Sequence, residues 1–294
     1  MGEPVYRGYD QEALDWQYDN RRRARVSADY VSFYQSASIE ARNTLPCTLD
    51  ISFGPSDAEV LDIFGPAKPG LPVPVHMFIH GGYWRALHKD DFSFVATPIV
   101  EAGGMAVVVN YALMPGVTMD ELVRQCRAAL AWLYQNAGDY GGDPDRITIS
   151  GHSAGGHLVT MMLATDWGAD YGLPQDVVKG GVALSGLYDL EPIRLCYLNK
   201  ELGMDEETAR RNSPINCLPD IPAGTAPPLV LTYGSLESEE FARQTVVYAD
   251  AWRARGHDCT VDPIVGHHHM SVISTMADRD SPLTCMIAAQ MGLS

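Results

Sequence analysis

The sequence predicts an α/β protein in which an eight-stranded, mostly parallel sheet carries helices on both faces. Two observations support this fold class: the chain contains eight apolar runs of strand length, and segments with helical periodicity separate most of them. Alternation of this kind is typical of parallel strands that are covered on both sides. We expect strands at residues 48–53, 59–64, 75–79, 106–110, 146–150, 181–185, 228–233 and 258–265.

The connections between these runs set the rest of the architecture. A short Gly-Pro-Ser-Asp link at 54–57 predicts that the first two strands form a hairpin, which makes the sheet mixed. The clearest helix is expected over 119–134, where apolar residues recur on one face. Residues 187–228 interrupt the alternation with Pro, Asn and acidic residues, so we expect a small cap-like insertion there. With a helical segment at 1–45, the chain is predicted to form one domain over 1–294.

A serine stands where a predicted strand turns sharply into a helix. The sequence Gly151-His152-Ser153-Ala154-Gly155 has the G-x-S-x-G pattern of a nucleophile elbow. Such a turn is strained and lifts the serine hydroxyl clear of the sheet, and the glycines avoid clashes with neighbouring backbone. The pattern alone also fits an ordinary Gly/Ser turn. The flanking strand and helix favour Ser153 as a nucleophile.

A second motif follows the strand at 75–79. The sequence His80-Gly81-Gly82-Tyr83-Trp84 is similar to an HGG-type loop, whose backbone amides stabilise the oxyanion formed in acyl transfer. The alternative is a Gly-Gly turn at a strand end. We expect His80 to support the loop. The predicted oxyanion hole comprises Gly81, Gly82, Tyr83 and Ala154, with the amides of the last three as donors.

The acid and the base of a triad should follow the serine in that order. Glu237 lies on the loop after the strand at 228–233 and is the predicted acid. Glu239 and Glu240 are alternatives, but acidic residues at these positions suit the first turn of the next helix. If none of the three serves, Asp262 and Asp258 are the next carboxylates to consider.

Three consecutive histidines follow the last predicted strand. His269 directly precedes the final helical stretch and is the predicted general base. A metal site is the alternative for His267, His268 and His269, but neighbouring side chains in an extended segment point in alternate directions. We therefore expect no metal and no organic cofactor, and we expect His268 to contact substrate.

Together, the motifs resemble the kynurenine formamidase (arylformamidase) group of the α/β-hydrolases, within the hormone-sensitive-lipase-like esterases. The resemblance spans almost the whole chain, and its most specific element is Trp84 after His80-Gly81-Gly82-Tyr83. Two positions depart from the family pattern: Glu237 stands where aspartate is common, and His269-Met270 stands where a His-Phe pair is common. The matching segments are 80–84, 151–158, 237–244 and His269, with weaker similarity at 6–10 and 142–146.

The resemblance implies an α/β-hydrolase fold with a Ser153-His269-Glu237 catalytic triad. The implied reaction converts N-formyl-L-kynurenine to L-kynurenine and formate, a step of tryptophan catabolism. Trp84 and Tyr188 are predicted to bind the aromatic leaving group by stacking, although each could equally be a core residue. A carboxylesterase or amidase acting on other small acyl aryl esters or amides is the alternative. A binding protein without activity is disfavoured, because serine, acid, histidine and oxyanion glycines occur together.

Composition limits the partners and the compartment. The net charge of −16 and the pI near 4.8 exclude the electrostatic footprint of nucleic-acid binding. The run Arg21-Arg22-Arg23-Ala24-Arg25 is expected to be a solvated or salt-bridged helix face. No signal sequence or 18-residue apolar stretch is visible, so a cytoplasmic location without membrane contact is expected. The six scattered cysteines should be reduced thiols. A small aryl amide or ester is the expected partner, and the sequence leaves open whether the chain forms a homodimer.

Overall fold

The computed structural model describes residues 2–24, 27–66 and 70–293 and contains one sheet of eight strands. Their order across the sheet is β1-β2-β4-β3-β5-β6-β7-β8. The pairs β1–β2 and β2–β4 are antiparallel and all other neighbours are parallel, which confirms the mixed sheet and its initial hairpin. The strands are β1 (Cys47–Ser52), β2 (Val60–Phe64), β3 (Val73–Ile79), β4 (Met105–Val109), β5 (Gly142–His152), β6 (Val178–Leu184), β7 (Leu229–Thr232) and β8 (Cys259–Val261).

The last strand is shorter than the run predicted at 258–265. Regular pairing of β8 with β7 ends after Val261, two residues before Pro263. Proline has no backbone N–H and cannot donate to the ladder. Pairing resumes once beyond it, where the Ile264 amide donates to the Tyr233 carbonyl over 2.8 Å. This bridge holds the two loops that follow β7 and β8 against each other.

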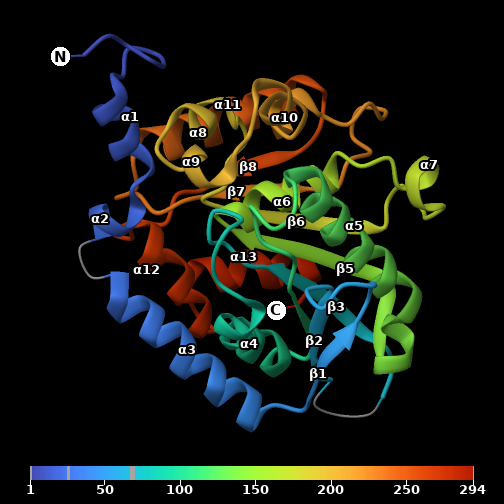
Figure 1. The fold of residues 1–294 in the computed structure, drawn as a ribbon. Coiled ribbons are helices and arrows are strands. Elements are labelled where there is room, and N and C mark those ends of the chain that lie inside the picture. Colours follow the sequence, from blue (N-terminus) through green and yellow to red (C-terminus); the bar gives the residue numbers. More distant parts are fainter. Residues whose placement is uncertain (1, 25–26, 67–69, 294) are drawn as a thin grey trace.

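Helices cover both faces of the sheet (Figure 1). The helix predicted at 119–134 extends over Met119–Asn136 and begins after Thr118, whose hydroxyl accepts the Glu121 amide. The helices are α1 (Gln11–Tyr18), α2 (Asn20–Ala24), α3 (Ser27–Thr44), α4 (Ala96–Glu101), α5 (Met119–Asn136), α6 (Ala154–Leu163), α7 (Trp167–Tyr171), α8 (Glu191–Leu195), α9 (Asn199–Leu202), α10 (Glu206–Arg211), α11 (Glu239–Ala254), α12 (His269–Ser274) and α13 (Pro282–Met291).

Alternation of side chains along the buried strands produces two apolar layers. In β4, Val107 and Val109 pack into the layer that also contains residues of α5, α6 and α11. Ala106 and Val108 face the other layer, which contains residues of α3, α4, α12 and α13. Consecutive strand residues point to opposite faces, so one fully apolar strand contributes to both layers. The central strands are therefore fixed on both sides.

The N-terminal helices run along one side of the molecule, where α2 and α3 contact α12 and α1 contacts α11 (Figure 1). Tyr18 in α1 donates its hydroxyl hydrogen to Glu240 over 3.0 Å, and Tyr34 in α3 donates to the carbonyl of Met270. These bonds tie the beginning of the chain to its last quarter.

Residues 187–228 carry α8, α9 and α10, which lie near α11 at one end of the molecule (Figure 1). Their role as a cap and the division of the chain into segments stay predictions.

Among residues 2–24, 27–66 and 70–293, no helix has the length and hydrophobicity needed to cross a lipid bilayer.

Candidate active site

Ser153 lies at the turn between β5 and α6. Its backbone has φ 59° and ψ −118°, a conformation that non-glycine residues rarely adopt. The turn is tight because Gly155 passes so close to β3 that a Cβ there would lie 2.0 Å from the Ile79 carbonyl oxygen. Only glycine fits at that position. The serine is thus held at the carboxyl end of the sheet, the edge at which α/β proteins bind ligands.

The loop after β3 lies directly against this turn. A Cβ on Gly81 would come within 3.0 Å of the Ser153 Cβ. Gly82 has φ +114°, and a Cβ there would overlap the Ala86 carbonyl, so the loop can fold back only with glycine at this position. Tyr83 also has a positive φ of 49°. Among the described residues, no acceptor is found for the Gly82 and Tyr83 amides, and the Ala154 amide opens α6.

His80 supports this loop from beneath. Its ring stacks on Tyr111 with a centroid distance of 4.4 Å, and its Nδ1 is 2.7 Å from the Gly81 carbonyl oxygen. Burial lowers the pKa of His80 to about 4, so the ring is neutral at physiological pH. A neutral ring donating to a loop carbonyl fits the supporting role expected for it.

Glu237 lies in the loop after β7 with its carboxylate fully buried. One oxygen accepts the amide of Gly234 over 2.7 Å and the hydroxyl of Ser185, which follows β6. The other oxygen lies 2.7 Å from Nδ1 of His269. The carboxylate is therefore oriented by three donors from three different loops.

His269 is the histidine that meets this carboxylate. A carboxylate only accepts hydrogen bonds, so the geometry assigns the hydrogen to Nδ1 and leaves Nε2 as the acceptor nitrogen. The ring lies against Phe241 and His152, with centroid distances of 4.8 and 4.6 Å. His269 and Ser153 line the same cavity. The structure thus brings together all three residues predicted as a triad.

The alternative carboxylates lie elsewhere. Glu239 and Glu240 form the first turn of α11, as their positions predict. Glu240 is buried and pairs with Arg243 over 2.7 Å. Glu239 is exposed and accepts a long bond from Tyr9. Neither forms a hydrogen bond with His269 in the described part of the chain.

His268, which was expected to contact substrate, has a structural role in the described fold. Its Nδ1 accepts the backbone amides of Met270 and Ser271, each over 3.2 Å, so the ring caps the N-terminus of α12. It does not line the cavity that contains Ser153. In the described part of the chain, no group of three or more His, Cys, Asp or Glu residues has an arrangement suited to a metal ion.

Trp84 and Tyr188 are also misplaced as substrate-binding residues, because both are buried in the core. Trp84 donates its indole N–H to Nδ1 of His157 over 3.2 Å, and Nε2 of His157 is 2.8 Å from the Asn212 carbonyl. The tryptophan therefore connects the loop after β3 to α6. Tyr188 stacks on Tyr248 with a centroid distance of 4.6 Å. Local pattern cannot distinguish such core aromatics from pocket aromatics.

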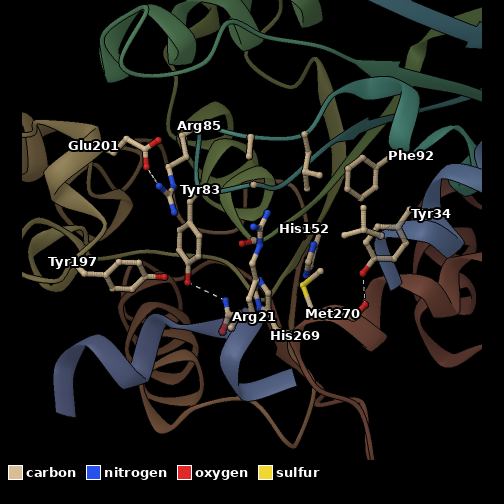
Figure 2. Close-up of a pocket in the computed structure, with 16 residues that line it drawn as sticks. Arg21, Tyr34, Tyr83, Arg85, Phe92, His152, Tyr197, Glu201, His269 and Met270 are labelled. Atoms are coloured by element: carbon tan, nitrogen blue, oxygen red, sulfur yellow. Dashed lines mark hydrogen bonds and ion pairs between the residues drawn. The ribbon is translucent and has the colours of Figure 1, made fainter. Parts of the chain in front are cut away.

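The cavity above Ser153 has a volume of about 290 Å³, close to the lower end of small-molecule sites, which span about 300–1,000 Å³. Figure 2 shows two contrasting sides, with Tyr83, Arg85, Tyr197 and Glu201 on one and Tyr34, Phe92 and Met270 on the other. The lining residues are Asn20, Arg21, Val31, Tyr34, Gly82, Tyr83, Arg85, Ala86, Leu87, Phe92, His152, Ser153, Tyr197, Glu201, His269 and Met270.

Two features of the site were not found by sequence reasoning. Ser185 carries no local motif, and it meets Glu237 only because β6 and β7 are neighbours. The arginine run was expected to be a solvated or salt-bridged face. In the structure Arg21 and Arg22 are exposed, in agreement with that expectation. Arg22 and Arg23 lie over the ring of Trp16, at 5.2 and 5.4 Å, and Arg21 also lines the cavity. Arg25 of this run lies outside the described residues.

Comparisons with known proteins agree with this architecture. A family model described as BD-FAE matches residues 61–177. A kynurenine formamidase of Danio rerio is 32% identical over 98% of this chain and 99% of its own length, and one of Salmo salar is 33% identical over 92% of each. The crystal structure of a candidate thioesterase from Silicibacter sp. tm1040 has a TM-score of 0.80 and 30% identity, covering 94% of this chain and 98% of that one. The chain therefore belongs to the kynurenine formamidase family of α/β-hydrolases.

Proposed function

We propose that this protein is a serine hydrolase that removes the formyl group from N-formyl-L-kynurenine, releasing L-kynurenine and formate. The observation that carries the proposal is the hydrogen-bonded pair of Glu237 and His269 in the same cavity as Ser153. The strained turn at Ser153 and the adjacent glycine loop support acyl transfer as the reaction class. The relatives named kynurenine formamidase support the substrate.

In this mechanism Nε2 of His269 removes the Ser153 hydroxyl proton while Oγ attacks the formyl carbon. The carbonyl oxygen becomes an oxyanion, which the amides of Gly82, Tyr83 and Ala154 stabilise. Collapse of the tetrahedral intermediate breaks the C–N bond, and His269 delivers its proton to the departing aryl amine. Ser153 then carries the formyl group as an ester.

Water completes the cycle by the same route. His269 takes a proton from water as the oxygen attacks the formyl ester, and a second oxyanion forms. Its collapse releases formic acid, which loses its proton to solvent and becomes formate. The proton returns from His269 to Ser153 Oγ. Throughout, Glu237 holds Nδ1 of the imidazole and stabilises its cationic form. These steps consume one water and need no further reactant.

The substrate is tested by comparing kcat/KM for N-formyl-L-kynurenine, other aryl formamides, aryl acetamides and short-chain p-nitrophenyl esters. We expect N-formyl-L-kynurenine to be hydrolysed most efficiently, and the acetamides to be much slower than the formamides. A kcat/KM for simple esters far above that for N-formyl-L-kynurenine would contradict the formamidase proposal. It would favour a carboxylesterase of small aryl esters instead.

A further inference from the structure

The charge of the cavity wall differs from that of the protein as a whole. The chain has a net charge of −16. The lining side chains that are charged at neutral pH, histidines aside, are Arg21, Arg85 and Glu201. Two arginines against one glutamate leave a net charge of +1 in the wall. An arginine without a carboxylate partner in such a wall attracts anionic ligands.

The two arginines are not equivalent. Arg85 forms an ion pair with Glu201, so its charge is largely compensated within the wall (Figure 2). In the described part of the chain, no carboxylate lies within ion-pair distance of Arg21. Arg21 also differs from its neighbours in α2, because Arg22 and Arg23 lie over the Trp16 ring, and Arg22 lines a different depression. Arg21 therefore supplies the unmatched positive charge.

Polar side chains line the same cavity as Arg21. Asn20, the residue before Arg21, donates its side-chain amide to the Tyr83 hydroxyl over 2.9 Å, and that hydroxyl donates to the Tyr18 carbonyl over 2.8 Å. These bonds fix α2 relative to the loop after β3. Burial raises the pKa of Tyr197 to about 12, so its hydroxyl keeps its hydrogen and can act as a donor at neutral pH.

The opposite side of the cavity suits an aromatic ring. Tyr34, Phe92 and Met270 lie on this side (Figure 2). His269 stands between this apolar side and the polar side with Tyr83 and Tyr197 (Figure 2), and Ser153 lines the same cavity. A ligand that fills the cavity would therefore place an aromatic ring near Phe92 and a polar or charged group among the tyrosines, with its acyl group at Ser153.

We infer that Arg21 binds the carboxylate of the substrate. It thereby selects aryl amides whose leaving group carries an α-amino acid group. This inference rests on the proposed function and specifies which part of the substrate α2 recognises. Guanidinium and carboxylate match in geometry and form paired, charge-assisted hydrogen bonds. The contact lies away from the bond that is broken, so it contributes to binding in the ground state and in the transition state alike.

The test compares a charged substrate with a matched neutral one. N-formyl-L-kynurenine is paired with 2′-formamidoacetophenone, which keeps the formamide, the ring and the ketone but lacks the amino-acid group. We expect Arg21→Gln to lower kcat/KM for N-formyl-L-kynurenine by about 10- to 100-fold, mainly through KM, as for the loss of a hydrogen bond to a charged group. The same variant should leave the neutral substrate within about twofold of wild type, since no interaction made by both substrates is lost.

Arg22→Gln is the matched control, because it removes a positive charge from the same helix outside the cavity. It should leave both substrates unchanged. Equal losses on both substrates in Arg21→Gln would indicate a structural role, and unchanged kcat/KM for both would show that Arg21 makes no contact. Either result overturns the inference.

A second series separates this inference from the proposed function. If wild type hydrolyses aryl acetates but not N-formyl-L-kynurenine, the formamidase proposal fails. Arg21 is then tested with aryl acetates that do or do not carry a carboxylate on a short ring substituent. A loss in Arg21→Gln confined to the carboxylate ester would support the inference, and equal rates would overturn it. Calorimetric titration of Ser153→Ala with L-kynurenine and 2′-aminoacetophenone, with and without Arg21→Gln, reports the same contact without turnover.

Discussion

The group of Ser153, Glu237 and His269 is built differently from the polar side of the cavity, which contains Arg85 and Glu201. The Glu237 carboxylate is fully buried and held by three donors, and Ser153 is only 2% exposed. In the wall, the side chains of the Arg85–Glu201 pair are 28% and 52% exposed. The side chains of the reaction centre are therefore buried and preorganised, whereas the charged side chains of the polar side, which come from α2, the loop after β3 and the segment around α9, are more exposed.

This difference predicts two kinds of mutational effect. Changes in the buried reaction centre should lower kcat by orders of magnitude, because its groups act on the reacting atoms. Changes in the wall should alter KM and substrate preference, because in the proposed complex its groups contact the leaving group. The Arg21 variants test the wall. The following predictions test the reaction centre and the packing behind it.

The largest effect is expected for Ser153→Ala. Removing the nucleophile should lower kcat by about 10⁴- to 10⁶-fold, as for triad serines in other hydrolases. The fold should persist, because alanine fits the space of serine; the circular dichroism spectrum and thermal midpoint check this. Stoichiometric labelling of wild type, but not of the variant, by a fluorophosphonate should identify the residue. Retention of more than a tenth of wild-type turnover would reject the assignment.

The pair His269→Ala and His268→Ala should separate catalysis from helix capping. His269→Ala should lose activity nearly as severely as Ser153→Ala, since it removes the general base. His268→Ala should retain most of its kcat and lose about 1 kcal/mol of stability, the typical value of an N-cap. Steady-state kinetics and urea unfolding measure the two effects. An inactive, stable His268→Ala protein would mean that the base is assigned one residue too late.

Glu237→Gln should reduce kcat by about 10²- to 10⁴-fold, less than loss of the serine, because the glutamine keeps a side chain beside His269 but cannot stabilise its charge. Glu239→Gln is the matched control. It changes the same functional group two residues away on an exposed position and should leave kcat near wild type. Similar, mild losses in both variants would show that another carboxylate orients His269.

The buried histidine His157 should make the free energy of unfolding decrease as the pH falls. Burial lowers the pKa of His157 from 6.5 to about 4. Above pH 6.5 both folded and unfolded chains carry this histidine neutral. Between about pH 6.5 and 4 only the unfolded chain takes up the proton, so His157 lowers the free energy of unfolding as pH falls, by about 3 kcal/mol in total.

Urea unfolding between pH 7.5 and 4.5 measures this effect, the pH range being set by the pKa values above. His157→Gln should show a shallower loss of stability towards acid than wild type, because glutamine does not titrate. The amide can still donate to the Asn212 carbonyl. Parallel pH profiles for the two proteins would contradict a neutral, buried His157.

Trp84→Phe should affect stability rather than activity. The ring remains, but the N–H that donates to His157 is lost, leaving a buried nitrogen without its donor. The cost should be about 1–3 kcal/mol in the free energy of unfolding. Because Trp84 does not line the cavity, KM should change little. A selective rise in KM for aromatic substrates at unchanged stability would instead place Trp84 in contact with the leaving group.

The sequence by itself determined the features that depend on local chain geometry. The strand, the strained serine and the helix at 142–163 follow from glycine positions and periodicity, and the order of Ser153, Glu237 and His269 follows from the order of the strand ends. The eight strands could be predicted because apolar runs indicate buried strands regardless of which helices pack on the sheet. The end of β8 was misjudged, because local hydrophobicity does not report where proline interrupts pairing.

Only the tertiary structure decided which side chains face the cavity. Trp84, Tyr188 and His268 carry groups suited to a ligand, yet packing turns them to His157, Tyr248 and the start of α12. Arg21 lies in a run that reads as a solvated face, and the docking of α2 beside α12 brings it to the site. The physical reason is that side-chain direction and burial depend on contacts between segments far apart in the chain. The hydrophobic periodicity of one segment does not report these contacts.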